Sequence, residues 1–175
     1  MAKDSPKTPK TSSSRSATNP SVSVWAAQCG KCLKWRKIST QEEFEEIRSR
    51  FNEEPFNCDN KPNGSCDDPV DIEYDSSRTW AIDKPNLPKT PSGFKRELYL
   101  RRDYSKMDAY YFTPSGKKLR SFTEVTTFLQ QNPDELSDIK ASDFSFTSPK
   151  IMDDTIPSTA LLANSNKKGA TSSTK

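Results

Sequence analysis

The sequence has no histidine and no apolar stretch long enough to span a lipid bilayer. Without histidine, the chain lacks the commonest general base and the commonest non-cysteine zinc ligand, which argues against most enzyme classes. A membrane helix needs roughly 20 consecutive apolar residues, and a secretory signal needs an apolar core. Because neither pattern is found, we expect an intracellular protein, in which cysteines stay reduced or bind metal.

Large apolar residues are also scarce, since Leu, Ile, Val and Phe make up about a sixth of the 175 residues. That share lies below the roughly one fifth at which disorder becomes common. The net charge of +3 is nevertheless too small for a fully disordered chain. Ser, Thr, Pro and Lys predominate at the two ends of the chain. The sequence therefore predicts disordered tails over residues 1–22 and 150–175 and a modest folded region between them.

The near-neutral total charge hides an acidic half and a basic half. Nine acidic residues lie between Glu53 and Asp83 against two basic ones, whereas ten basic residues lie between Lys84 and Ser121 against three acidic ones. The Pro-rich segment where the two halves meet has the composition of an extended connector. We therefore predict two modules, over residues 23–76 and 77–149.

Two helices are expected to begin at the same kind of capping signal. Thr40 with Glu43, and Ser121 with Glu124, place a hydroxyl at the N-cap and a carboxylate three residues later. Both signals precede apolar residues at helical spacing. The expected apolar faces are Phe44, Ile47 and Phe51 in the first helix, and Phe122, Val125, Phe128 and Leu129 in the second.

Three short strand signals precede the second helix. The segment "FKRELYLRR" alternates between Leu98 and Leu100 on one face and Glu97, Tyr99 and Arg101 on the other. The segments "AYYF" and "KKLR" flank a "TPSG" turn, as in a hairpin. The order strand, strand, strand, helix predicts an α+β fold, in which one helix packs on a small sheet.

The chain has four cysteines: Cys29, Cys32, Cys58 and Cys66. Four thiolates are enough for one closed tetrahedral zinc site, which would organise a segment that has little core of its own. Disulfides are a second interpretation, and the intracellular setting counts against them. A redox pair in "CGKC" is a third, but it does not follow a strand of a βαβ unit and would leave two cysteines unused.

The residues around the first two cysteines favour the zinc interpretation. The segment "WAAQCGKCLKWRKI", followed by the distant cysteine pair, resembles the CW-type zinc finger over about residues 25–68. The resemblance implies that the four cysteines bind one Zn²⁺ ion. Members of that family often bind a methylated lysine of a histone tail in an aromatic cage. By this resemblance Trp25 and Trp35 are candidate cage residues, with packing around the metal site as the alternative role. The usual first cage position holds Ala26.

The aromatic and basic residues of "DAYYFTPSGKKLRSF" fit the surface of DNA. The major groove presents guanine O6 and N7 as paired acceptors, and a guanidinium fork satisfies both. Reading the two guanines of a CpG step needs two rigidly held arginines, and Arg101 and Arg120 stand at suitable strand ends. Lys117 and Lys118 are expected to meet phosphates, which position a protein without reading sequence.

From "SGFKRELYLRR" to "SDFSF" the chain resembles the methyl-CpG-binding domain. This resemblance implies an α/β sandwich with a three- to four-stranded antiparallel sheet and one helix. A CW finger directly before that domain resembles one class of plant methyl-CpG-binding-domain proteins. The resemblance implies that Arg101 and Arg120 read the bases and that Asp108 steadies one of them. It also matches Tyr110 to the tyrosine beside a cytosine methyl group, and Ser121 to the serine after the second arginine. The six-residue loop between Arg101 and Asp108 is shorter than in the vertebrate domains.

We therefore expect a nuclear, chromatin-associated regulator of transcription without catalytic activity, which binds double-stranded DNA, with methylated CpG as its candidate target. The alternative is a scaffold with weak or absent preference for methylated CpG. In that case the finger binds a histone tail or another partner, and the protein recruits histone-modifying or repressor complexes. Neither hypothesis involves a membrane or a small-molecule substrate. A dithiol redox enzyme is a third hypothesis, against which the absent histidine and the C-x7-C spacing count.

Overall fold

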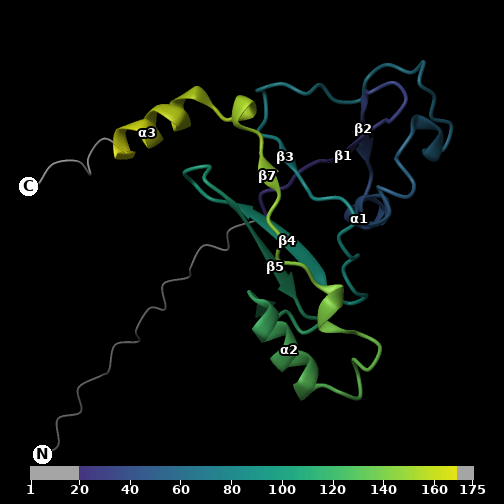
Figure 1. Ribbon diagram of the computed structural model, residues 1–175, viewed down its shortest axis with the longest axis vertical. Coiled ribbons are helices and arrows are strands. Elements are labelled where there is room, and N and C mark those ends of the chain that lie inside the picture. Colours follow the sequence, from purple (N-terminus) through teal and green to yellow (C-terminus); the bar gives the residue numbers. More distant parts are fainter. Residues whose placement is uncertain (1–19, 169–175) are drawn as a thin grey trace, which may run out of the picture.

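The structure is a computed structural model of the chain, and it describes residues 20–168. The predicted tails fall partly outside these residues, because 1–19 and 169–175 are not described. The fold is mixed α and β with antiparallel sheets, as predicted. In Figure 1, β1, β2 and α1 lie at the upper right and α2 lies at the bottom. None of the helices within 20–168 is long and apolar enough to cross a membrane.

The first module is a small hairpin with a helix beside it. Strands β1 (Trp25–Gln28) and β2 (Trp35–Ile38) pair antiparallel, helix α1 (Gln41–Ser49) follows, and a short 3-10 helix, η1, covers Cys58–Asn60. Its apolar core is small and consists of Ala27, Ile38 and Phe56, with Trp25, Phe44 and Ile47 packed against them. So small a core leaves much of the stability of this module to other interactions.

Helix α1 begins where the capping signal predicts. The Thr40 hydroxyl accepts a hydrogen bond of 3.1 Å from the backbone N–H of Glu43. Thr40→Ala is expected to cost about 1 kcal/mol in the free energy of unfolding, because an N–H group of the first turn loses its partner. Urea unfolding would measure this, with Thr40→Ser as a control that keeps the hydroxyl. An equal loss in both variants would contradict the capping role.

The inner face of α1 is more polar than predicted. Phe44 and Ile47 pack against the core, but Phe51 lies beyond the end of the helix and is exposed. The two buried residues of the helix are Glu45 and Arg48. The predicted apolar face is therefore only partly correct, since two charged residues occupy the most buried positions.

The second module is a three-stranded antiparallel sheet, in the order β4–β5–β6, with a helix packed on it. Its elements are β4 (Lys95–Leu100), β5 (Met107–Phe112), β6 (Lys118–Leu119) and α2 (Phe122–Gln131). The core under α2 consists of Phe94, Tyr111, Leu119, Val125 and Phe144. Phe128 and Leu129 pack against this core as predicted. The prediction for Phe122 was wrong, because its side chain is 55% exposed.

The chain remains ordered beyond the predicted boundary at residue 149. Strand β7 (Lys150–Ile151) pairs with β3 (Ala81–Ile82), a short 3-10 helix, η3, covers Asp153–Thr155, and helix α3 spans Ser158–Lys168. Ile151 and Ile156 are buried against Leu98, Met107 and Ala109. The prediction of a disordered tail from residue 150 is therefore corrected for the part that the structure describes. The apolar residues that order this segment are few, which is why composition missed them.

The segment before β1 is also attached to the fold. The backbone N–H of Ser21 donates to the Leu98 carbonyl at 2.8 Å, and the Ser21 hydroxyl accepts from the Leu100 N–H at 2.6 Å. Val22 packs beside the cluster around Leu98. Residues 21 and 22 were predicted to belong to the disordered tail, and instead they bind the second module.

A buried polar network joins the two modules. Asp83 accepts hydrogen bonds from Arg48 of α1 at 2.8 Å and from Arg96 of β4 at 2.9 Å. The exposed fractions of the three side chains are 6% for Asp83, 4% for Arg48 and 1% for Arg96. Beside them, Glu45 accepts from the N–H of Thr90 at 2.8 Å. Since each module supplies charged partners to the other, these contacts bind the two modules together.

Candidate metal centre and nucleic-acid interface

The four cysteines meet between the β1–β2 turn and η1. Their Sγ atoms all lie within 4.8 Å of one another. The Sγ atoms of Cys29 and Cys66 are 3.8 Å apart, and those of Cys32 and Cys58 are 3.6 Å apart. A tetrahedral ion with metal–sulfur bonds of about 2.3 Å requires sulfur–sulfur separations of about 3.8 Å. The cysteine cluster therefore fits a single tetrahedral metal ion.

The surroundings of the cluster favour the thiolate form of Cys29. Burial opposes ionisation of Cys29, but backbone N–H groups, including those of Lys31 and Cys58, more than offset this and lower its pKa. Burial and the neighbouring thiols raise the pKa of Cys66. Four such thiols ionise together only when a cation balances their charge, which is the condition that a bound metal meets.

Arg36 of β2 places a positively charged side chain beside the cysteine cluster. Its Nε donates to Cys58 Sγ at 3.2 Å, and its Nη1 donates to Asp71 at 3.1 Å. Its Nη2 donates to the carbonyl oxygens of Ser65 and Asp68, each at 3.1 Å. The buried guanidinium thus fixes the loop that carries Cys66. Burial raises the pKa of Cys58, and the hydrogen bond from Arg36 opposes that rise by favouring the thiolate form. The sequence analysis missed this role of Arg36.

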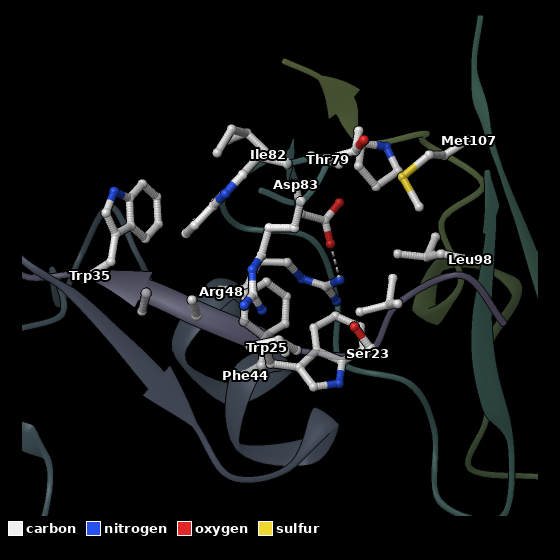
Figure 2. A pocket seen from close by; sticks show the side chains of 18 of the residues that line it. Ser23, Trp25, Trp35, Phe44, Arg48, Thr79, Ile82, Asp83, Leu98 and Met107 are labelled. Atoms are coloured by element: carbon white, nitrogen blue, oxygen red, sulfur yellow. Dashed lines mark hydrogen bonds and ion pairs between the residues drawn. The ribbon is translucent and has the colours of Figure 1, made fainter. Parts of the chain in front are cut away.

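The two candidate cage tryptophans have different aromatic partners. The centroid of the Trp25 ring lies 4.8 Å from that of Phe44. The centroid of Trp35 lies 5.0 Å from that of Trp80 and 6.4 Å from that of Tyr74. No ring contact joins Trp25 to Trp35 among the described residues. Both tryptophans line the same pocket without touching each other (Figure 2), and their role as a cage stays a prediction. The structure adds Tyr74 and Trp80, which sequence reasoning missed, to the group around Trp35.

Arg101 is held as a rigid fork at the end of β4. Its Nε and Nη2 donate to the two carboxylate oxygens of Asp108 at 2.9 and 3.0 Å, while 52% of its side chain stays exposed. These hydrogen bonds hold the pKa of Asp108 below its usual range. Because the pKa is lowered in the folded protein, the pair persists at neutral pH and is lost only as the pH falls through the lowered value. This places Asp108 beside Arg101, where the resemblance predicted it.

The register between β5 and β6 places the second arginine, Arg120, beside β5. Asp108 and Tyr110 alternate with buried residues on β5 and so share one face of the sheet. Leu119 of β6 pairs with Tyr111, so Arg120, the next residue, comes opposite Tyr110. Arg120 is exposed, and its backbone N–H donates to Glu124 at 2.6 Å. Arg101 and Arg120 thus flank the Asp108–Tyr110 stretch of β5 from the two neighbouring strands.

Each of the remaining candidates contacts a neighbour in the same module. Lys117 is exposed, with its Nζ 5.7 Å from the Phe128 ring centroid. Lys118 lies with its Nζ 3.8 Å from the ring centroid of Tyr110 and 5.0 Å from that of Tyr99. This cation–π contact holds Lys118 on the aromatic face rather than free in solvent. Ser121 caps α2, because its hydroxyl accepts from the Glu124 N–H at 3.2 Å.

Tyr99 and Glu97 of β4 belong to the same surface and were not among the predicted site residues. The Tyr99 ring lies 5.5 Å from that of Tyr110, and its hydroxyl donates to Glu97. Burial and this hydrogen bond raise the pKa of Tyr99 to about 12. Strand alternation placed both residues on the same face as Arg101, so the signal was present in the sequence.

Two family models match the chain, one for each module. Residues 25–72 match the CW-type Zinc Finger, and residues 80–154 match the Methyl-CpG binding domain. The second match runs past the predicted boundary at residue 149 and includes β7. Both resemblances inferred from the sequence are therefore confirmed.

Curated relatives support the second match. The chain is 60% identical over 136 residues to "Methyl-CpG-binding domain-containing protein 4" of Arabidopsis thaliana, an alignment that covers 78% of this chain and 73% of the relative. It is 59% identical over 138 residues to "Methyl-CpG-binding domain-containing protein 1" of the same plant, covering 79% and 67%. The human "Methyl-CpG-binding domain protein 2" is 37% identical over 70 residues, covering 38% of this chain and 16% of the relative. The chain belongs to the methyl-CpG-binding-domain family, with a CW-type zinc finger in front of the DNA-binding domain.

Proposed function

We propose that the protein is a nuclear, chromatin-associated regulator of transcription that binds CpG steps of double-stranded DNA and performs no catalysis. The observation that carries the proposal is the Arg101–Asp108 fork, held rigid while it remains half exposed. A guanidinium in this state is prepared for a bidentate bond to guanine without further ordering. Arg120 provides the second guanidinium from the other side of β5.

The methyl groups of a CpG step would meet the aromatic surface between the two arginines. Tyr110 is central to that surface, and Lys118 and Tyr99 hold its ring in place. Methyl discrimination rests on small increments, since burial of one methyl group contributes about 0.8 kcal/mol. A rigid ring is therefore a requirement for preferring methylated DNA.

We also propose that the metal of the cysteine cluster is one Zn²⁺ ion. Zinc prefers closed sites of four cysteine sulfurs, and the sulfur separations suit its bond length. The ion would have a structural role, because four protein ligands leave no position for a substrate.

The proposed DNA function is tested with a short duplex that carries one CpG, methylated or unmethylated, over a salt series. Arg101→Ala and Arg120→Ala are each expected to lower the affinity at constant salt about 5- to 150-fold, because each removes a bidentate base contact. Arg102→Ala, an exposed neighbour in the β4–β5 loop, serves as the matched control. It should change mainly the salt dependence, as a lost phosphate contact does.

The pattern of binding separates the proposal from its competitor. Equal affinity for the two duplexes, unaffected by the Arg101 and Arg120 substitutions, would mean phosphate attraction only. No binding at moderate salt would favour a scaffold that recruits histone-modifying or repressor complexes, with the finger as a module for histone tails or another partner. The six-residue loop from Arg101 to Lys106 favours that second candidate, because a short loop offers few phosphate contacts.

A further inference from the structure

We propose that Phe122 contacts the C5-methyl group of a thymine that flanks the CpG step, so that the protein selects CpG sites with a neighbouring thymine. The inference rests on the proposed DNA function and extends the recognition beyond the two base pairs of the CpG. It starts from the exposure of this side chain, which is 55%. The other apolar residues of α2, which are Val125, Phe128 and Leu129, pack in the core under the helix.

The ring of Phe122 has no aromatic partner in the part of the chain that the structure describes. None of the ring contacts and none of the core clusters within residues 20–168 includes it. A ring in this state keeps apolar surface in water, and a binding partner that covers it gains free energy. Single exposed apolar residues are common on protein surfaces, so the surroundings of the ring decide its role.

The backbone directs Phe122 to the same side as Arg120. Ser121, which lies between them, is extended, with a φ of −151° and a ψ of 162°. Side chains on either side of an extended residue point in the same direction. Arg120 is exposed like Phe122, whereas the Ser121 hydroxyl turns back to cap α2. With Arg120 bound to a guanine, Phe122 therefore faces the same groove of the DNA.

The chemistry around Phe122 favours a base edge over a phosphate as its neighbour. The backbone N–H of Arg120 donates to the Glu124 carboxylate at 2.6 Å. Glu124 is exposed, so its negative charge lies at the surface of the first turn of α2 and repels phosphates. The ring itself offers a phosphate no hydrogen bond. In the major groove, the apolar group that an unmodified base presents is the C5-methyl of thymine, and phenylalanine is one of its usual partners.

The spacing along the chain places this thymine outside the CpG step. An extended chain rises about 3.3 Å per residue, so the Cα atoms of Arg120 and Phe122 are about 6.6 Å apart. Successive bases of one strand rise about 3.4 Å each. The ring is therefore about two base steps from the guanine that Arg120 contacts. Two steps from that guanine lie outside the CpG in either direction along the groove.

The test measures binding of the full zinc-loaded chain to duplexes that carry one methylated CpG with two A·T pairs on each side. In one duplex the thymines precede the cytosine of the CpG, and in the other they follow the guanine. Each thymine position is then replaced by uracil, which removes only the C5-methyl group. At one position the replacement should lower the affinity of the wild-type chain about two- to four-fold, the factor that burial of one methyl group supplies.

Three variants assign the methyl contact to one side chain. Phe122→Ala should bind the thymine and uracil duplexes equally, while its preference for methylated CpG and the salt dependence of its affinity stay as in the wild type. Phe122→Leu keeps an apolar side chain and should retain part of the thymine effect. Phe51→Ala makes the same change at an exposed phenylalanine of the finger and should retain all of it. Because Phe122 belongs to no core cluster, Phe122→Ala should unfold at the same urea concentration as the wild type.

The outcomes separate this inference from the proposed function. A wild-type chain that binds the CpG duplexes but ignores every replacement by uracil would overturn the inference alone. An equal uracil effect in Phe122→Ala would also overturn it, because the methyl group would then act through the shape of the DNA. Loss of the preference for methylated CpG in Phe122→Ala, without a uracil effect in the wild type, would move the ring to the CpG itself and refute the thymine contact. Absence of binding to any duplex would overturn the proposed function, and this inference with it.

Discussion

Cys58→Ser is expected to abolish tight metal binding and to unfold the finger. Cys58 is fully buried, and Arg36 donates to its Sγ. Structural Zn²⁺ supplies roughly 10–16 kcal/mol to the folding of isolated fingers, and the core of Ala27, Ile38 and Phe56 is too small to replace it. Metal content by mass spectrometry should fall from one equivalent of zinc to almost none, and the near-UV signal of the finger tryptophans should collapse.

The loss should extend beyond the finger. Helix α1 belongs to the finger but carries Arg48, which pairs with Asp83 in the network shared with β4. The DNA-binding domain is therefore expected to unfold at a lower urea concentration in Cys58→Ser. Lys31→Ala is a suitable control, because its exposed side chain is adjacent to the cluster without contributing a ligand. A Cys58→Ser protein that retains one tightly bound zinc ion and unfolds normally would refute a four-cysteine site.

Asp83→Asn is expected to be the most damaging substitution away from the cysteines. It leaves the guanidinium groups of Arg48 and Arg96 buried beside a neutral amide. Removing one partner of a buried ion pair typically costs about 3–5 kcal/mol, because the remaining charge is uncompensated. Urea unfolding should show a correspondingly lower midpoint with both modules unfolding earlier.

The matched control is Asp59→Asn, which makes the same chemical change in an exposed ion pair. Asp59 and Lys31 are 61% and 60% exposed, so their attraction is weakened by water. This substitution should leave the midpoint almost unchanged. Similar midpoints for Asp83→Asn and Asp59→Asn would show that the buried network contributes little, and that the two modules are held together mainly by apolar contacts.

Local signals explain why much of the fold could be predicted from the sequence. The N-caps Thr40 and Ser121 act within three residues of themselves, so the starts of α1 and α2 follow from short motifs. The spacing of the four cysteines also indicates the metal cluster, because four reduced thiols in one short segment typically bind a metal ion. Strand alternation correctly placed Leu98 on the buried face of β4 and Glu97 and Tyr99 on the other face.

The inter-module network could not be predicted, because it depends on contacts between distant residues. An arginine or a carboxylate in a sequence predicts exposure, and only its partner makes burial possible. Arg48 pairs with Asp83, which lies 35 positions later in the chain. No periodic pattern in the sequence predicts a partner at that separation. The short strands β3 and β7 were missed for the same reason, since two residues each give no recognisable alternation.

The arrangement of Ser21 and Gln41 on β4 has a consequence for solubility. Strand β4 is an outer strand of its sheet, and an outer strand with free backbone groups is a template for other copies of the chain. Ser21 donates its backbone N–H to the Leu98 carbonyl and accepts from the Leu100 N–H through its hydroxyl. The Gln41 side-chain amide donates to the Arg96 carbonyl at 2.8 Å. The finger and the segment before it thus close an edge that would otherwise invite self-association. A DNA-binding domain separated from its finger would lose this protection together with any partner that the finger binds.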